Sequence, residues 1–417
     1  MENIVEILLS RGFIEQISAK ELKNTVNQQV GVYCGFDPTS DSLHLGNLVA
    51  LMGLAWFEKV GHKVYAIAGG ATGMIGDPSG KKHERKLLDE ETIQTNLRGI
   101  TKNVNSILKD PVILNNFDWF KNFTLIDFLR DVGKQFRMGP MLGKDSVRTR
   151  LQSEEGMSFT EFSYQILQAY DFLYLFDTYG VTVQIGGSDQ WGNITAGQEL
   201  IRKQRSQSVF GMTFPLLTTS TGQKFGKSEE GAIWLSPEKS SPYELYQYLY
   251  RIPDADVVGL LYKLTFLPVD QVREVERNME RPDYTPNAAQ KLLAQQVTEI
   301  VHGKDGVEIA QKVTSSACPG GEADLDPSVF EAIAQDMPSQ TLARDEVEGQ
   351  KVLDLFVKGG LLASKGDARR LIRNGGAYLN NRKIDDENRS VSAEDLIGDK
   401  MLLLGAGRKK RLLIRIS

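Results

Sequence analysis

Two short segments, about 180 residues apart, carry side chains that could act on a polyphosphate. In the first, a strand-like run ends at Gly35, a turn with Pro38 follows, and His44-Leu45-Gly46-Asn47 comes next. The pattern places His44 at the start of a helix, where free backbone N–H groups and the helix dipole favour an anion. Gly46 leaves space for a nucleotide ring close to the backbone. A histidine that merely caps a strand–helix turn is the alternative interpretation.

The second segment is Lys224-Phe225-Gly226-Lys227-Ser228, in a stretch rich in Gly, Thr and Ser. Two lysines three positions apart on a loop can reach two oxygens of one polyphosphate. They could stabilise the charge that develops on a departing pyrophosphate. Alone, this segment could be an ordinary solvated loop. Its combination with the histidine segment is what favours nucleotide chemistry.

A third group of polar residues lies on one predicted helix. Tyr164, Gln168 and Asp171 are spaced i, i+4 and i+7, so they project from one face of that helix. A solvated helix face is the alternative. Tyr33 and Asp77, however, lie near the ends of two predicted strands. Together these groups could form a pocket that holds an ammonium group at one end and a phenol at the other.

Short apolar runs that alternate with helical patterns would position these side chains. Residues 32–34, 63–68 and 181–186 read as buried strands, and an amphipathic helix is predicted between the first two, from Leu48 to Ala55. The alternation predicts an α/β fold with a Rossmann-like, doubly wound parallel sheet, which binds ligands at the carboxyl ends of its strands. Helical patterns dominate from about residue 241 to 314. We therefore predict a catalytic domain with a connective insertion (1–230), an all-helical domain (231–320), a linker (321–349) and a small α+β domain (350–417).

Charge is unevenly distributed along the chain. The 417 residues carry a net charge of −5, yet residues 351–417 hold 15 Lys and Arg against 8 Asp and Glu, so this tail is +7 and the remainder −12. A basic end on an acidic body is typical of a module that binds phosphate groups, with a merely soluble basic surface as the alternative.

Cysteine content and hydropathy bear on the compartment. The two cysteines, Cys34 and Cys318, lie far apart, which argues against a disulfide framework or a thiolate zinc site and for a reducing compartment. No apolar run approaches membrane-spanning length, and the N-terminus is unlike a signal or transit peptide. We expect a cytoplasmic protein with no membrane partner.

The two phosphate-directed segments resemble the signature motifs of class I aminoacyl-tRNA synthetases, His-Ile-Gly-His and Lys-Met-Ser-Lys-Ser. Asn47 replaces the second histidine, for which we expect a quantitative effect rather than loss of activity. Residues 69–80, 158–164 and 184–194 are similar to bacterial-type tyrosyl-tRNA synthetases, and the similarity extends over the whole chain. This resemblance implies an enzyme that activates L-tyrosine with ATP to tyrosyl-adenylate and pyrophosphate, and then transfers tyrosine to tRNA(Tyr). Mg²⁺ would accompany the ATP, and we expect no protein-bound structural metal.

The resemblance also implies roles for individual residues. Tyr33 and Asp171 match residues that hydrogen-bond the tyrosine hydroxyl, and no general base is needed because the tyrosine carboxylate is itself the nucleophile. The predicted contacts of the ammonium group are Asp77, Tyr164 and Gln168, and Gln184 is assigned to the same tyrosine site. The predicted ATP and adenylate contacts are Cys34, Asp37, Gly46, Asn47, Gly187, Asp189, Gln190 and Lys227. The predicted transition-state contacts are Thr39, His44, Lys81, Arg85, Lys224 and Lys227.

Partners follow from the same resemblance. The tail from about residue 350 is similar to the RNA-binding fold of a small-subunit ribosomal protein, so its basic helix would contact tRNA phosphates. The helical domain would meet the anticodon arm, and residues 117–136 with Phe159 would lie near a homodimer interface. The predicted tRNA contacts are Arg202, Lys203, Lys365, Arg369, Arg370 and Arg373.

Two other functions remain as alternatives. A tryptophan-specific relative should lack the hydroxyl acceptors Tyr33 and Asp171, because indole has no phenol. A catalytically inactive RNA-binding homologue should have lost one of His44, Lys224, Lys227 or Asp171, and all four are present.

Overall fold

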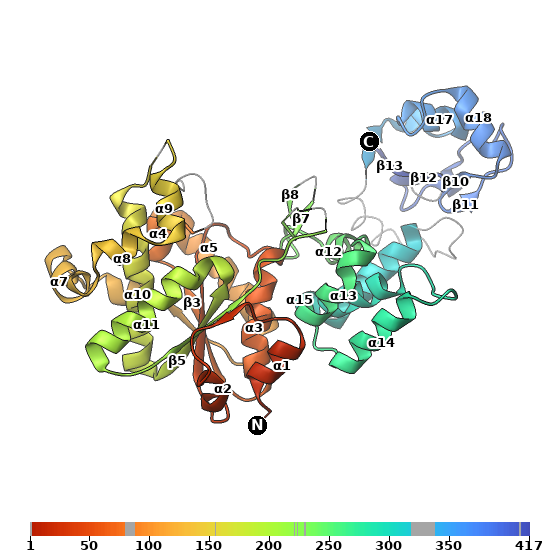
Figure 1. Ribbon diagram of the computed structural model, residues 1–417. Helices are drawn as coiled ribbons and strands as arrows, with labels where there is room; N and C mark the ends of the chain where they lie inside the picture. Colours follow the sequence, from red (N-terminus) through yellow and green to blue (C-terminus); the bar gives the residue numbers. More distant parts are fainter. Residues whose placement is uncertain are drawn as a thin grey trace. The chain divides into compact units, whose positions relative to one another are not determined.

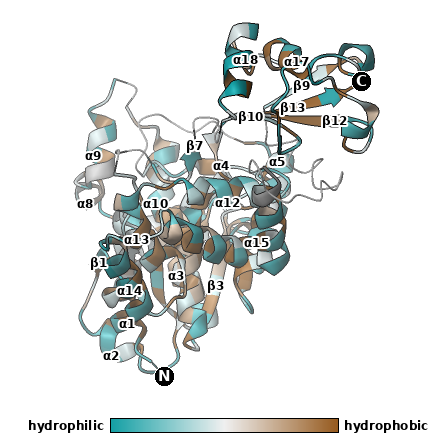
Figure 2. Cartoon of the chain, turned by 90° about the vertical axis from the view of Figure 1, so that its right-hand side faces the viewer, coloured by the Kyte–Doolittle hydropathy of each residue, from teal (hydrophilic) through white to brown (hydrophobic). Residues whose placement is uncertain are grey.

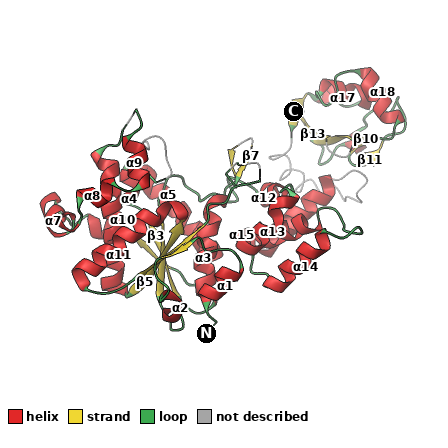
Figure 3. Ribbon diagram, viewed as in Figure 1, coloured by secondary structure: helices red, strands yellow, loops and turns green. Residues whose placement is uncertain are grey.

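The computed structural model describes residues 2–79, 88–154, 156–220, 222, 224–228, 231–317, 338–407 and 410–417. The chain forms two compact units, one of residues 1–239 and 248–301 and one of residues 240–247 and 302–417. The first unit holds an α/β sheet with its surrounding helices, and the second includes a smaller sheet with two helices (Figure 1; Figure 3).

A six-stranded sheet forms the centre of the first unit, in the order β1-β6-β5-β2-β3-β4. The strands from β6 to β4 are parallel, and the edge strand β1 runs antiparallel to β6. The order reverses between β2 and β5, which is the switch point where doubly wound sheets bind ligands. The predicted fold class is confirmed. The strands are β1 (Gln16–Ile17), β2 (Gly31–Phe36), β3 (Lys63–Ala68), β4 (Val112–Asn115), β5 (Val181–Gly187) and β6 (Phe210–Phe214).

Helices cover both faces of this sheet. Helix α3 (Leu48–Lys59) lies on one side, and α10 (Phe159–Tyr179) and α11 (Trp191–Arg205) pack together on the other (Figure 1). Strands β2 and β3 are buried almost throughout, as expected for parallel strands covered on both faces. The remaining helices before β4 are α1 (Ile4–Ser10), α2 (Leu22–Thr25), η1 (Leu45–Asn47), α4 (Thr72–Ile75) and α5 (Glu90–Ile107).

Helix α10 has clear start and stop signals. The Ser158 hydroxyl accepts a hydrogen bond from the Glu161 N–H at 3.2 Å, and the helix ends at Gly180, whose φ of +68° favours glycine. The Glu161 carboxylate is also in a buried ion pair with Arg150, at 2.5 Å. This pair ties α10 to the connective insertion, which contains α6 (Phe117–Phe120), α7 (Leu125–Asp131), η2 (Gly133–Gln135), α8 (Met138–Leu142) and α9 (Asp145–Leu151).

The stretch after the sheet is helical, as its sequence pattern predicts. It contains α12 (Pro242–Tyr250), α13 (Asp254–Leu264), α14 (Val269–Met279) and α15 (Ala288–Ala317), whose backbone is not helical at Gly303. A small hairpin of β7 (Lys227–Ser228) and β8 (Gly231–Ala232) precedes them. None of the helices in the described ranges has both the length and the apolar character needed to cross a membrane.

A buried arginine joins α13 to the N-terminal helices of the first unit. The Arg11 guanidinium donates to the backbone carbonyls of Tyr262, Thr265 and Leu267 at 2.7–2.8 Å. It also lies over the ring of Trp56 on α3, 4.6 Å from the centroid. These contacts satisfy the carbonyls of Tyr262 and Thr265 at the end of α13 and that of Leu267 just beyond it.

A five-stranded sheet and two helices form the C-terminal part of the second unit. The order β11-β10-β12-β13-β9 places β13 between antiparallel β12 and parallel β9. Helix α18 is mainly hydrophilic on its visible surface, whereas β12 is hydrophobic (Figure 2). The elements are β9 (Ser339–Leu342), η4 (Arg344–Glu346), α17 (Val352–Lys358), α18 (Lys365–Arg373), β10 (Ala377–Leu379), β11 (Arg382–Lys383), η5 (Ala393–Asp395), β12 (Met401–Ala406) and β13 (Lys410–Ile416).

The predicted boundary between the linker and the C-terminal domain is wrong, because strand β9 lies inside the predicted linker. Residues 339–342 lie inside the range 321–349 that was predicted as a linker, yet they pair with β13 and so belong to the sheet. The partner of β9 is about 70 residues away in sequence, so local periodicity carries no sign of the pairing. Residues 318–337 of that range lie outside the described residues.

Candidate active site

The switch point carries the first part of the candidate site. Tyr33 on β2 lies in register with Gln184 on β5. The Tyr33 side chain is 1% exposed and packs on Phe172 of α10, with 5.2 Å between ring centroids. Burial, and then the charge of the Asp171 carboxylate, raises the pKa of the Tyr33 hydroxyl well above its ordinary value. Tyr33 and Asp171 therefore lie close enough to interact electrostatically.

Two donors that the sequence did not reveal hold the Asp171 carboxylate. Trp119 Nε1 donates to Oδ1 at 2.9 Å, and Asn116 Nδ2 donates to Oδ2 at 3.1 Å. Burial raises the pKa of Asp171 to about 8, with the two hydrogen bonds acting in the opposite direction. Asn116 directly follows β4, so the rule that polar groups at strand ends line a site could have found it. Nothing in the sequence marks Trp119.

Three buried polar atoms near the switch point lack a hydrogen-bond partner among the described residues: Tyr33 Oη, Gln168 Oε1 and Gln184 Oε1. Gln168 is one helical turn before Asp171 on α10. A buried polar atom without a partner costs about 1–3 kcal/mol. A polar ligand at the switch point could supply hydrogen-bond partners for these three atoms.

A second carboxylate lies in the loop after β2. Asp37 accepts hydrogen bonds from Thr72 Oγ1 and from Tyr164 Oη, both at 2.8 Å. Burial raises the pKa of Tyr164, followed by the charges of Asp37, Asp77 and Asp171. A cluster of carboxylates around one buried tyrosine is an environment that favours an ammonium group.

A third carboxylate, Asp77, connects this cluster to the end of β5. It accepts hydrogen bonds from Gln190 Nε2 at 2.7 Å and from the Ser79 N–H at 2.9 Å. Asn193 in turn donates to Gln190 Oε1 at 3.2 Å. Burial, and then the charge of Asp77, raises the pKa of Asp189. The predicted residues Asp77, Asp189 and Gln190 are therefore neighbours.

Glycines make room for these carboxylates. A Cβ on Gly69 would lie 2.2 Å from Asp37 Oδ1, and one on Gly187 would lie 2.6 Å from Asp189 Oδ1. Any side chain at either position would displace an acidic group of the site.

The histidine segment starts a short 3₁₀ turn rather than α3 itself. The Asn47 side-chain oxygen accepts a hydrogen bond from the His44 N–H at 3.1 Å, so Asn47 closes the turn that presents His44. The loop containing Lys224 and Lys227 lies against the same turn, because a Cβ on Gly226 would come within 2.9 Å of the Gly46 N atom. The fold thus brings together the two segments that the sequence separates.

The remaining predicted nucleotide contacts fall in three groups. Lys224 and Lys227 are exposed, and the charge of Lys224 partly offsets the effect of burial on the pKa of Asp189. Thr39 is exposed, whereas Cys34 is buried and burial raises the pKa of its thiol to about 12. Lys81 and Arg85 lie outside the described residues.

The predicted tRNA contacts lie away from this cluster in sequence and are paired within the protein. On α11, Arg202 forms two hydrogen bonds of 2.8 Å with Glu199, and Lys203 donates to the Gln135 carbonyl at 2.8 Å. On α18, each of the four predicted cations forms an ion pair with an acidic residue. The pairs are Lys365–Asp354, Arg370–Asp367, Arg373–Glu387 and Arg369–Glu387.

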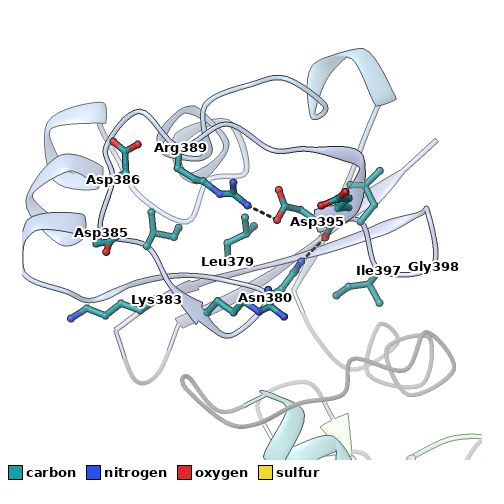
Figure 4. Close-up of a pocket in the computed structure, with 13 residues that line it drawn as sticks. Leu379, Asn380, Lys383, Asp385, Asp386, Arg389, Asp395, Ile397 and Gly398 are labelled. Carbon is teal, nitrogen blue, oxygen red and sulfur yellow. Dashed lines mark hydrogen bonds and ion pairs between the residues drawn. The ribbon is translucent and has the colours of Figure 1, made fainter.

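Cavities also occur outside the switch point, among the residues that the structure describes. One of about 240 Å³ is lined by Lys144 and Lys203, among others; burial lowers the pKa of Lys144 to about 8. Another, of about 340 Å³, is in the C-terminal domain (Figure 4). There Arg389 and Asp395 form an ion pair at 2.7 Å, and the lining carries both charge signs, so it is not a simple phosphate site.

No group of three or more His, Cys, Asp or Glu residues that could hold a metal occurs in the described part of the chain.

Comparisons with known proteins match both parts of the chain. The family model "tRNA synthetases class I (W and Y)" matches residues 24–317, and the model "Tyrosine--tRNA ligase SYY-like C-terminal domain" matches residues 329–414. The tyrosine--tRNA ligase of Protochlamydia amoebophila is 58% identical over 100% of this chain and 99% of its own length. The chloroplastic and mitochondrial tyrosine--tRNA ligase of Arabidopsis thaliana is 50% identical over 100% of this chain and 84% of its own.

A solved structure agrees. The C-terminally truncated mitochondrial tyrosyl-tRNA synthetase of Aspergillus nidulans is 33% identical, covers 74% of this chain and 92% of its own, and superposes with a TM-score of 0.66. With the switch-point cluster and the paired signature segments, these matches lead to one conclusion: the chain belongs to the tyrosyl-tRNA synthetase family of class I tRNA synthetases.

Proposed function

We propose that this protein activates L-tyrosine with ATP to tyrosyl-adenylate and pyrophosphate, and then transfers tyrosine to tRNA(Tyr). The observation that carries the proposal is the buried Tyr33 hydroxyl, which has no hydrogen-bond partner among the residues that the structure describes and is affected by the charge of the Asp171 carboxylate. A phenolic hydroxyl can bond both groups at once. Phenylalanine would leave the buried Tyr33 hydroxyl without this partner and would add no hydrogen bond to Asp171, which disfavours its binding.

The other end of the substrate would lie among acidic groups. Asp77, Tyr164 and Gln168 would hold the ammonium group, and Gln184 would complete the tyrosine site. Support comes from the carboxylates that, after burial, raise the pKa of Tyr164, and from the Gln168 and Gln184 oxygens, which have no partner in the described part of the chain. Discrimination against tryptophan follows from the same polar lining, since an indole cannot satisfy the Tyr33 and Asp171 pair.

The adenylate would extend from this pocket across the ends of β2 and β5. The groups proposed to contact it are Cys34, Asp37, Gly46, Asn47, Gly187, Asp189, Gln190 and Lys227. Burial keeps the Cys34 thiol neutral, so it can act as a hydrogen-bond partner of a ribose. The Asn47 oxygen is already used by the His44 N–H, which leaves the Asn47 amide nitrogen as the donor towards a nucleotide.

The chemistry needs no acid or base from the protein. The tyrosine carboxylate attacks the α-phosphorus, and the bond to the pyrophosphate breaks. Thr39, His44, Lys224 and Lys227, and by resemblance Lys81 and Arg85, would stabilise the charge that moves onto the pyrophosphate. Mg²⁺ would enter with ATP as part of that substrate.

Each part of the chain would serve one portion of the tRNA. We assign catalysis to residues 1–230 and contact with the anticodon arm to residues 231–320. Residues 350–417, with β9, would bind tRNA phosphates. Exposed ion pairs are weak, so the cations of α18 can exchange their acidic neighbours for phosphates at small cost. Arg202 and Lys203 would contact the acceptor arm.

A homodimer is proposed from an exposed apolar surface on the insertion. Leu125, Ile126, Met138 and Phe159 are each more than half exposed, and α7 has no buried residue. Leu125 and Ile126 lie on α7, Met138 lies on α8 and Phe159 begins α10; exposed large apolar groups of this kind are typical of an interaction site. We also propose a cytoplasmic location, on the cysteine content alone.

The test is ATP–pyrophosphate exchange, measured separately with each of the twenty amino acids. Exchange with tyrosine and no exchange with phenylalanine or tryptophan is the expected result. Exchange driven by tryptophan, or by none of the twenty, would remove the proposed substrate.

A further inference from the structure

The loop that carries Lys224 and Lys227 is hydrogen-bonded at two points to residues outside both signature segments, Asp256 and Tyr248. At the first point, the Ser220 N–H and hydroxyl both donate to the Asp256 carboxylate at 3.0 Å. Asp256 lies in the first turn of α13, where the helix dipole favours a negative charge. Bonds to a charged acceptor are stronger than neutral ones.

The second point is Tyr248 on α12. The Gly226 N–H, between the two lysines, donates to Tyr248 Oη at 2.8 Å. The Tyr248 ring also packs edge-on against Phe225, with 5.7 Å between centroids. Burial raises the pKa of Tyr248, so its hydroxyl stays neutral. Tyr248 thus contacts two successive residues of the signature segment.

From Gly226 a run of hydrogen bonds leads to the histidine segment. The Gly226 carbonyl accepts from the Ile233 N–H at 2.9 Å, and the Ile233 carbonyl accepts from the Leu45 N–H at 2.7 Å. Gly226 has a φ of +83°, and its α-carbon has no room for a side chain against Gly46. These bonds and the close approach hold Gly226 against the histidine turn, and the bond from the Gly226 N–H to the Tyr248 hydroxyl connects the same residue to α12.

We propose that Tyr248 and Asp256 are positioning residues for adenylate formation: they hold the Lys224–Lys227 loop in register with the His44 turn. The inference rests on the proposed function, in which these lysines stabilise the departing pyrophosphate. Misplacing the loop slows the step in which pyrophosphate leaves. It leaves tyrosine binding unchanged, because that proposed site lies on β2, β5, α10 and the loop after α4. It also spares transfer from a preformed adenylate to tRNA, in which no pyrophosphate takes part.

The first experiment compares Tyr248→Phe with Tyr284→Phe. Tyr284 is a matched control, because its hydroxyl also accepts one backbone N–H, that of Ala289, at 2.8 Å, away from the loop. Adenylate formation and transfer to tRNA are measured separately in rapid-quench single turnovers. Tyr248→Phe should form the adenylate roughly two- to tenfold more slowly, with the KM for tyrosine and the transfer rate unchanged. Tyr284→Phe should resemble the wild type.

A merely structural role for Tyr248 predicts a different result. Both steps would then slow together, or the two phenylalanine variants would lose the same activity, and either outcome overturns the inference. In a Lys224→Ala, Lys227→Ala background, adding Tyr248→Phe should have no further effect on adenylate formation, because the hydroxyl acts through the lysines. An additive loss there would also count against it.

The contact between Asp256 and Ser220 is tested by comparing a variant of Asp256 with a control variant of Asp254. Asp256→Asn should slow adenylate formation roughly two- to fivefold, because the acceptor of Ser220 loses its charge. Asp254→Asn alters the same turn of α13 but affects a bond to Gln290, so it should leave the rate unchanged. A wild type without tyrosine-dependent exchange would refute both the proposed function and this inference. A wild type with exchange, and unaffected Tyr248 and Asp256 variants, would refute the inference alone.

Discussion

At the scale of single residues, Asp171 is an ionisable group in surroundings that disfavour its charge. Two hydrogen bonds hold it, yet burial keeps its pKa near 8, well above the value of about 3.9 in an unfolded chain. Folding therefore favours the protonated carboxyl. Its contribution to stability is complete below the unfolded pKa and is lost as the pH rises through the folded value.

The raised pKa of Asp171 gives a prediction for how the stability of the ligand-free protein depends on pH. Between about pH 5 and pH 8, Asp171 should lower the free energy of unfolding by up to about 1.4 kcal/mol per pH unit. Urea unfolding of the wild type and of Asp171→Asn at several pH values measures it. The asparagine variant should show a shallower decline, and equal declines would contradict the raised pKa.

Tyr33 should separate activity from stability. Tyr33→Phe removes a buried hydroxyl that has no partner within the described ranges, so the variant should be at least as stable as the wild type in thermal unfolding. Its kcat/KM for tyrosine activation should fall about tenfold, because the substrate phenol loses a partner. Activation of phenylalanine should not fall. A variant that loses stability but keeps its preference for tyrosine would place the hydroxyl in a structural role.

Helical spacing is a local pattern, and Tyr164 and Asp171 lie on one helix, α10, as predicted. Tyr33 and Asp77 were predicted near strand ends, but Tyr33 lies in the middle of β2 and Asp77 follows α4. The sequence did not identify Trp119 as the partner of Asp171, since that contact depends on how the insertion folds back on α10. The unexpected use of Asn47 has the same origin: the spacing shows the residue but not the backbone group it bonds.

At the scale of elements, the doubly wound parallel sheet and α10 were predictable, whereas β9 was not. Alternating strands and helices determine a doubly wound sheet through short connections. Strand β9 is four residues long and pairs with a distant segment, so neither composition nor periodicity distinguishes it from a linker.

The contact between the two signature segments gives an element-scale prediction. Gly226 and Gly222 have similar φ values, +83° and +80°, but only the Gly226 Cβ position is crowded, by backbone of the histidine turn. Gly226→Ala should therefore reduce the exchange rate at least tenfold, and Gly222→Ala, which shares only the strained φ, should reduce it little. Equal exchange rates for the two variants would show that the close approach is unimportant.

At the scale of the whole molecule, the C-terminal domain should matter for tRNA alone. Replacing Lys365, Arg369 and Arg373 by alanine should leave tyrosine-dependent exchange unchanged and raise the KM for tRNA. The slope of log Kd for tRNA against log salt should decrease by about 0.7–0.9 for each phosphate that the variant no longer neutralises. Filter binding over a salt series measures it, and an unchanged slope would remove α18 from the RNA-binding surface.

The place of β13 in its sheet has a consequence for synthesis of the chain. This strand is encoded after every other element of the domain, yet it lies between β12 and β9 and supplies buried Leu413 and Ile414. The nascent domain therefore cannot close its core until residues 410–416 have left the ribosome. A truncated chain that ends shortly before residue 410 would have an exposed sheet edge in its C-terminal domain, which proteases can recognise. Its six-stranded sheet would already be complete, because the last strand of that sheet ends at Phe214.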